Sequence, residues 1–143
     1  MVGVPEFVID ASVALAWAFA DESSAISRST FTSLLSGAAT AHVPALWPIE
    51  MVNVLLRGPR NGTKLSDSDL HEFFEGLMQM SLKVHPQSLG TLAKDAPRIM
   101  KKHALSAYDT AYLLLAASKG LPLATHDRKL QQAALAEGVT ILE

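Results

Sequence analysis

Cysteine is absent from this sequence of 143 residues. Without thiols the chain cannot form disulfides, use a thiolate nucleophile or bind a metal through cysteine. Long hydrophobic runs are absent as well. The longest apolar stretch, around residues 11–20, falls short of the roughly 18 residues that a membrane span requires. We therefore expect neither a disulfide-stabilised secreted protein nor a membrane protein.

A large excess of one charge is also missing. Twelve Lys and Arg residues against 14 Asp and Glu residues give a net charge of -2, so we do not expect a broadly basic nucleic-acid-binding surface. A local basic patch beside an acidic pocket stays compatible with this balance. Near the start, Glu6 and Asp10 lie where a secretion signal would carry basic residues, and a cytoplasmic protein is therefore expected.

What the sequence does contain is an apolar core divided into short segments. Hydrophobic residues make up 49% of the chain, which is ample for a folded protein. A chain of about 150 residues can bury roughly 68–70% of its unfolded surface. No internal repeat or low-complexity linker divides the sequence. A single domain spanning residues 1–143 is the expected organisation.

Short strands and helices alternate along the chain. Strands are predicted within residues 7–9, 41–45, 82–86, 121–125 and 139–143. Helices are predicted at residues 12–19, 23–35, 48–56, 66–80, 88–103, 103–118 and 128–136, and Pro97 is expected to disturb or divide the fifth of them. This alternation predicts an α/β/α sandwich of three layers, with a mainly parallel central sheet of about five short strands.

Four acidic residues recur at one kind of position. Asp10, Glu50, Asp109 and Asp127 each fall at a predicted helix cap or in a predicted first turn. In a parallel sheet the carboxyl end of each strand leads toward the next helix, and ligands bind at that edge, so we expect the four acids to gather there. For Asp109 a structural role is open too, because Ser106 and Asp109 have the spacing of a capping box.

Four neighbouring carboxylates would raise the pKa of one another. Helix N-termini, worth about 0.3–1 kcal/mol each, relieve only part of that repulsion. A divalent cation would relieve more, and oxygen ligands without cysteine favour Mg²⁺ or Mn²⁺ over Zn²⁺. One or two such ions can activate water and stabilise both oxygens of a phosphodiester under attack. Hydrolysis of nucleic acid is therefore the predicted chemistry.

Three stretches together resemble the PIN-domain ribonucleases of the VapC toxin type. They are VIDAS with Asp10, PIEMVNVLL with Glu50 and Asn53, and SAYDTAYLLLAASKGLPLATHDRKL with Asp109 and Asp127. The resemblance covers nearly the whole chain. It implies a PIN-like fold and a metal-dependent endoribonuclease that cuts RNA. It also implies inhibition by a cognate VapB-like antitoxin and a homodimer.

The resemblance also implies roles for individual residues. Asp10 and Asp109 are expected to be the main ligands of Mg²⁺ or Mn²⁺, while Glu50 and Asp127 bind the metal or orient water. Ser12 and Thr125 are expected to hydrogen-bond these carboxylates. Asn53 is expected either to orient Glu50 or reach substrate, or to serve helix packing. Five basic residues are candidates for RNA phosphate contacts or for ordinary surface charge: Arg57, Arg60, Lys64, Arg128 and Lys129.

Several alternatives stay open on the sequence. His126 is expected to be exposed on a loop and receives no role. Trp17, Phe19 and Trp47 belong either to the core or to a groove that takes an antitoxin helix. The functional alternative is a catalytically silent PIN fold that binds RNA or a protein partner without cutting.

Overall fold

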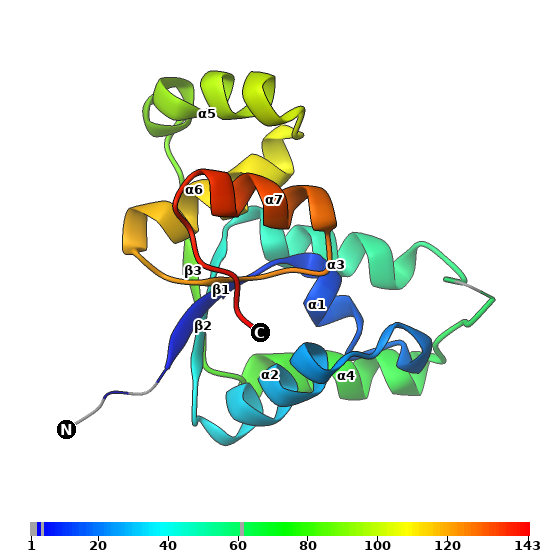
Figure 1. The fold of residues 1–143 in the computed structure, drawn as a ribbon. Coiled ribbons are helices and arrows are strands. Elements are labelled where there is room, and N and C mark those ends of the chain that lie inside the picture. Colours follow the sequence, from blue (N-terminus) through cyan, green and yellow to red (C-terminus); the bar gives the residue numbers. More distant parts are fainter. Residues whose placement is uncertain (1–2, 4, 61) are drawn as a thin grey trace.

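A central parallel sheet organises the computed structural model, which describes residues 3, 5–60 and 62–143 (Figure 1). The strand order is β3-β2-β1-β4. The strands are β1 (Glu6–Ile9), β2 (Thr40–Pro44), β3 (Leu82–His85) and β4 (Leu123–Ala124). All pairings are parallel, and β1 lies between β2 and β4. The predicted α/β class is confirmed, with four strands in the described residues instead of five.

Helices cover both faces of this sheet. Helix α6 packs against β1, β2 and β4, and both α5 and α7 lie on α6 (Figure 1). Helices α2 and α3 contact β2, while α1 packs against both and α4 against α2. The helices in the described ranges are α1 (Ala11–Leu15), the short 3₁₀ helix η1 (Ala20–Glu22), α2 (Ala25–Ser36), α3 (Leu46–Leu56), α4 (Asp67–Gln79), α5 (Leu89–His103), α6 (Ala107–Lys119) and α7 (Arg128–Ala136). The layers form the predicted sandwich.

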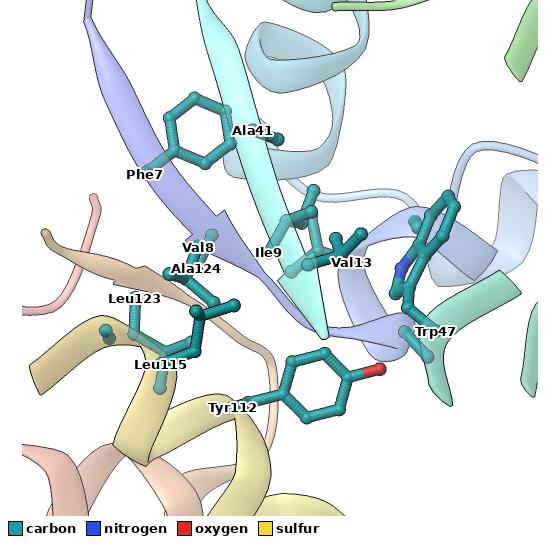
Figure 2. Close-up of a cluster of buried hydrophobic side chains, with 14 of the residues drawn as sticks. Phe7, Val8, Ile9, Val13, Ala41, Trp47, Tyr112, Leu115, Leu123 and Ala124 are labelled. Carbon is teal, nitrogen blue, oxygen red and sulfur yellow. The ribbon is translucent and has the colours of Figure 1, made fainter. Parts of the chain in front are cut away.

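The core consists of strand side chains that alternate between the two helical layers. Val8 is fully buried and lies with Leu115 of α6 and Leu123 of β4 (Figure 2). Its neighbour Ile9 points to the opposite face, where Val13 and other side chains of α1 and α3 lie (Figure 2). Since successive residues of a strand face opposite sides, the short apolar run of β1 is buried on both faces and places residue 10 at the sheet edge.

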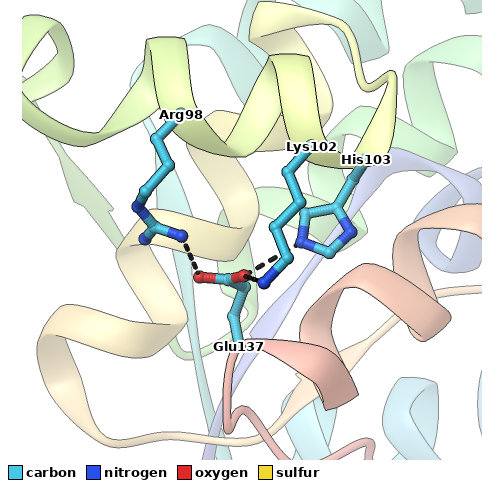
Figure 3. Close-up of polar contacts among 4 residues, drawn as sticks. All are labelled: Arg98, Lys102, His103 and Glu137. Carbon is cyan, nitrogen blue, oxygen red and sulfur yellow. Dashed lines mark hydrogen bonds and ion pairs between the residues drawn. The ribbon is translucent and has the colours of Figure 1, made fainter.

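A charged cluster joins α5 to the end of α7 (Figure 3). The carboxylate of Glu137 accepts hydrogen bonds from Arg98 Nη1 at 2.9 Å, Lys102 Nζ at 3.3 Å and His103 Nε2 at 2.9 Å. These donors lower the pKa of Glu137 to about 2, with His103 and Arg98 the largest causes. The cluster holds the outer helix α5 against the body of the protein.

Three predicted boundaries are corrected by the structure. Helix α6 begins at Ala107 and not at residue 103, because α5 runs to His103 and Ser106 caps α6. Helix α1 ends at Leu15, after which the chain tightens into turns with hydrogen bonds between residues three apart. Helix α3 begins at Leu46, two residues before Pro48, because a first-turn residue needs no N–H donor. Glu50 therefore lies two residues deeper in α3 than expected and outside its first turn.

Two further predictions are wrong, the interruption of a helix at Pro97 and the strand at residues 139–143. Helix α5 continues through Pro97 without a break. The missing N–H of Pro97 affects the carbonyl of Ala93, and both residues are exposed, so water can replace the lost bond. Residues 139–143 form only an isolated parallel bridge between Ile141 and Leu123, because β4 is two residues long and offers few groups to pair. No helix among the described residues is long and apolar enough to span a bilayer.

Candidate active site at the carboxyl edge of the sheet

Asp10 follows β1 directly and caps the N-terminus of α1. Its side chain is 5% exposed. Oδ1 accepts hydrogen bonds from Ser12 N at 2.9 Å, Val13 N at 3.3 Å and Ser12 Oγ at 2.5 Å, and Oδ2 accepts one from Thr125 Oγ1. Burial raises the pKa of Asp10 despite these bonds. The hydrogen bonds thus fix the carboxylate at a buried position where the ionised form is disfavoured.

Two hydroxyl groups, one after β1 and one after the neighbouring strand β4, fix this carboxylate. Ser12 Oγ accepts the backbone N–H of His126 at 3.0 Å, and Thr125 Oγ1 accepts that of Asp127 at 3.0 Å. Each hydroxyl oxygen therefore accepts a backbone N–H from the segment after β4, and each hydroxyl donates its own proton to Asp10. The two residues form a clasp, which we call the hydroxyl clasp, that ties the start of α7 to the end of β1.

Glu50 approaches the same edge from α3. Its half-buried carboxylate accepts a hydrogen bond from the Tyr112 hydroxyl at 2.9 Å. Burial raises the pKa of Glu50, and the negative charges of Asp10 and Asp109 raise it further. Glu50 is therefore electrostatically coupled to two of the other acids, although it lies outside the first turn of α3, where it was expected.

Asp109 and Asp127 complete the acidic group. Asp109 is half-buried in the first turn of α6, and burial followed by the charge of Asp127 raises its pKa. The hydroxyl of Ser106 and the charge of Lys129 oppose this shift. Asp127 is exposed and caps α7, where Oδ1 accepts hydrogen bonds from Lys129 N at 2.9 Å and Leu130 N at 3.1 Å. Four acids from four elements thus influence one another at one edge.

The donor set suits a hard divalent cation. Every charged donor is a carboxylate, and the pKa is raised in Asp10, Glu50 and Asp109, so a bound cation would stabilise their ionised forms. Asp10 Oδ2 accepts a single hydrogen bond and retains room for another partner. Across residues 3, 5–60 and 62–143, however, no three Asp, Glu or His side chains converge into a ready cation site.

The structure separates the predicted basic residues into two groups. Arg128 and Lys129 are exposed in the first turn of α7, directly after Asp127. Arg60 instead forms a bidentate ion pair with Glu22, with Nε and Nη2 at 2.8 and 2.9 Å from the two carboxylate oxygens. Arg57 and Lys64 are exposed between α3 and α4, and Asn53 is exposed on α3. The structure brings only the α7 pair beside the acids.

Two side-chain contacts were not predicted from the sequence. His126 is half-buried, not exposed, because its Nε2 lies 2.7 Å from the hydroxyl of Ser24, the cap of α2. Ser24 is 102 residues away in sequence, so no local pattern indicates the pair. Tyr112 follows Asp109 by three residues, and this helical spacing was the available signal that its hydroxyl faces the acids.

Of the three aromatic residues with two possible roles, two lie in the core and one lies at the surface. Trp47 and Phe19 are buried at 4% and 2% exposure and belong to the core. Trp17 is half-buried and lines a hollow of about 620 Å³ between α2 and α4. Phe31, Leu35, Phe73 and Met80 line its apolar part, and Asp69, Glu72 and Glu75 contribute carboxylates. The hollow is therefore apolar inside and acidic at its rim.

The chain belongs to the PIN domain family, because the PIN domain model matches residues 7–136. Within the PIN domain family, the chain is similar to a ribonuclease of the VapC type. Ribonuclease VapC3 of Pyrobaculum aerophilum is 35% identical over 104 residues, which cover 68% of this chain and 74% of that protein. The resemblance to VapC-type proteins seen in the sequence is confirmed.

Two solved structures share the fold. PAE2754 from Pyrobaculum aerophilum has a TM-score of 0.63 at 21% identity and covers 91% of this chain and 80% of its own. FitAcB from Neisseria gonorrhoeae has a TM-score of 0.62 at 16% identity and covers 96% of both chains. At these identities the similarity shows the fold alone.

Proposed function

We propose that the protein is a Mg²⁺- or Mn²⁺-dependent endoribonuclease and the toxin of a VapBC-type pair. The observation that carries this proposal is Asp10, a buried carboxylate fixed by two hydroxyls beside three further coupled acids. The similarity to Ribonuclease VapC3 supports RNA as the substrate. Because the substrate is cellular RNA, the proposed compartment is the cytoplasm.

In this proposal Asp10 and Asp109 hold one or two divalent ions, and Glu50 and Asp127 contribute either directly or through water. When bound, such an ion lowers the pKa of water and polarises a phosphoryl oxygen. The hydroxyl clasp of Ser12 and Thr125 keeps the Asp10 carboxylate oriented.

On the substrate side, Arg128 and Lys129 are placed to neutralise phosphates next to Asp127. Asn53 stays a candidate for substrate contact, as do Arg57 and Lys64, because all three are exposed. Arg60 is a weaker candidate, since its guanidinium already binds Glu22.

The test is cleavage of total cellular RNA by the purified protein with Mg²⁺ or Mn²⁺. We expect discrete products that disappear with EDTA and in Asp10→Asn. Asp67→Asn, which removes an exposed acid from the start of α4, is the matched control and should cleave normally. If metal-loaded wild type free of antitoxin cleaves none of several RNA pools, the silent binding module becomes the better description.

The hollow beside Trp17 suits the antitoxin. An apolar floor with the acidic rim of Asp69, Glu72 and Glu75 matches a helix that has one apolar and one basic face. We expect Glu72→Lys combined with Glu75→Lys to weaken binding of a VapB-like antitoxin by at least about tenfold, which corresponds to about 1.4 kcal/mol. Calorimetric titration measures this, and unchanged affinity would place the antitoxin elsewhere.

A homodimer is also part of the proposal. Ile49, Val52 and Leu56 form an exposed apolar stripe on α3, at 73%, 45% and 57% exposure. Exposed Met78 of α4 continues the stripe around an apolar hollow of about 370 Å³. An apolar face of this kind is suited to meet its own copy across a twofold axis.

A further inference from the structure

We propose that Tyr112 is a positioning residue whose phenol hydroxyl holds the Glu50 carboxylate in place beside Asp109 and so raises the affinity of the site for a divalent cation. This inference rests on the proposed metal site. It assigns a role to a residue on which the sequence motifs gave no information.

The position of Tyr112 is fixed by the core. The residue is 2% exposed, and its ring lies below the ends of the central strands (Figure 2). The hydroxyl donates to Glu50 Oε1 at 2.9 Å. Tyr112 and Asp109 are three residues apart on α6 and therefore project from one face of that helix. A rigid helix thus carries both a proposed metal ligand and the hydrogen-bond donor to another.

The hydrogen bond of the Tyr112 hydroxyl is directed at one atom of Glu50. In the part of the chain that the structure describes, Tyr112 is the side chain that hydrogen-bonds Glu50, and it engages only one of the two carboxylate oxygens. The phenol hydroxyl is the donor of this bond, because the carboxylate oxygen that it meets is an acceptor. Oε2 of Glu50 is left available for another partner.

This hydrogen bond orders the Glu50 carboxylate before a cation binds, so less side-chain conformational entropy is lost on binding. Glu50 has three side-chain torsions, and fixing one oxygen removes much of their freedom before binding. Removal of a partner that orients a ligand typically lowers metal affinity by 10–100-fold. A purely structural Tyr112 would affect folding but not the cation.

The experiment is calorimetric titration of Mn²⁺ into metal-free wild type, Tyr112→Phe and Tyr108→Phe. Tyr108 lies on the same helix but is 65% exposed, which makes it the matched control. We expect Tyr112→Phe to bind Mn²⁺ roughly tenfold more weakly. We also expect its loss of RNA cleavage to shrink as the Mn²⁺ concentration rises, which a folding defect would not produce.

A double substitution tests whether the effect passes through Glu50. In Glu50→Gln, adding Tyr112→Phe should change Mn²⁺ affinity no further. Unchanged affinity in Tyr112→Phe, or an equal loss in the Glu50→Gln background, would overturn the inference while leaving the metal site intact. If wild type itself binds no Mn²⁺, the proposed metal site is refuted and this inference with it.

Discussion

Asp10 illustrates at the scale of one residue how a buried charge makes stability depend on pH. Its pKa in the folded protein lies above the ordinary value of 3.8, because burial disfavours the ionised form. The stabilising contribution of this group is therefore complete below pH 3.8 and is lost as the pH rises through the folded-state pKa.

The substitution Asp10→Asn removes this dependence and keeps a good helix cap. In EDTA we expect Asp10→Asn to gain stability relative to wild type between pH 4 and pH 7. Urea unfolding at the two pH values measures this difference. A difference that stays constant between them would contradict the buried-charge explanation, and added Mg²⁺ should stabilise wild type only.

The hydroxyl clasp makes a second prediction for a single residue. Thr125→Val keeps the shape of a buried side chain but removes the hydrogen-bond partner of the Asp127 N–H and of the Asp10 oxygen Oδ2. We expect a loss of about 1–3 kcal/mol in the free energy of unfolding. Mn²⁺ affinity should fall by roughly tenfold.

Thr125→Ser retains the hydroxyl and serves as the control for this prediction. It should recover most of the metal affinity measured by calorimetry. If Thr125→Val binds Mn²⁺ and cleaves RNA as well as Thr125→Ser does, the hydroxyl has no role in holding Asp10.

Residues that act through their immediate neighbours were predictable from the sequence. The caps formed by Asp10, Asp127 and Ser106 follow from the side chain and the helix that begins there. The contact of Tyr112 with Glu50 spans 62 residues, and that of His126 with Ser24 spans 102. Such contacts depend on how the helices pack, which no local pattern records.

At the scale of an element, the cluster on Glu137 holds α5 in place. Replacement of Glu137 by Gln removes the negative charge that pairs with three basic side chains (Figure 3). We expect Glu137→Gln to lower the free energy of unfolding by about 1 kcal/mol near pH 7, the upper range for partly exposed ion pairs. Glu72→Gln, an exposed acid of α4, should have little effect.

The sign of the pH dependence follows from the lowered pKa of Glu137. The carboxylate stabilises the fold fully above the ordinary value of 4.5 and loses this effect as the pH falls toward about 2. The difference between wild type and Glu137→Gln in urea unfolding should therefore shrink below pH 4.5. A difference as large at pH 3 as at pH 7 would mean that Glu137 acts by packing and not by charge.

Element boundaries were predicted unevenly. Helix α4 begins where the Ser66 and Asp69 pair indicates a cap, and α7 spans the predicted residues. The early end of α1 and the missing strand at residues 139–143 have no comparable signal. Whether apolar residues such as Val139 and Ile141 pair as a strand depends on the length of the edge they meet, which the fold sets.

At the scale of the whole molecule, the apolar stripe on α3 determines the expected assembly. Ile49, Val52 and Leu56 are spaced so that they line one side of the helix, and exposed Met78 lies beside them. The described residues that line the hollow beside the stripe are all apolar. A twofold pairing would therefore be favoured by about 25 cal/mol for each Å² of apolar surface that it removes from water.

Sedimentation equilibrium tests this assembly directly. We expect wild type to be a dimer and Val52→Lys to be a monomer, because an isologous interface would bring the two introduced charges together with no partner. Leu89→Lys is the matched control, since Leu89 is 82% exposed at the start of α5, away from the stripe, and that variant should remain dimeric. Because the acids come from one chain, monomeric Val52→Lys should still bind Mn²⁺. A monomeric wild type, or a dimeric Val52→Lys, would show that the α3 stripe is not the interface.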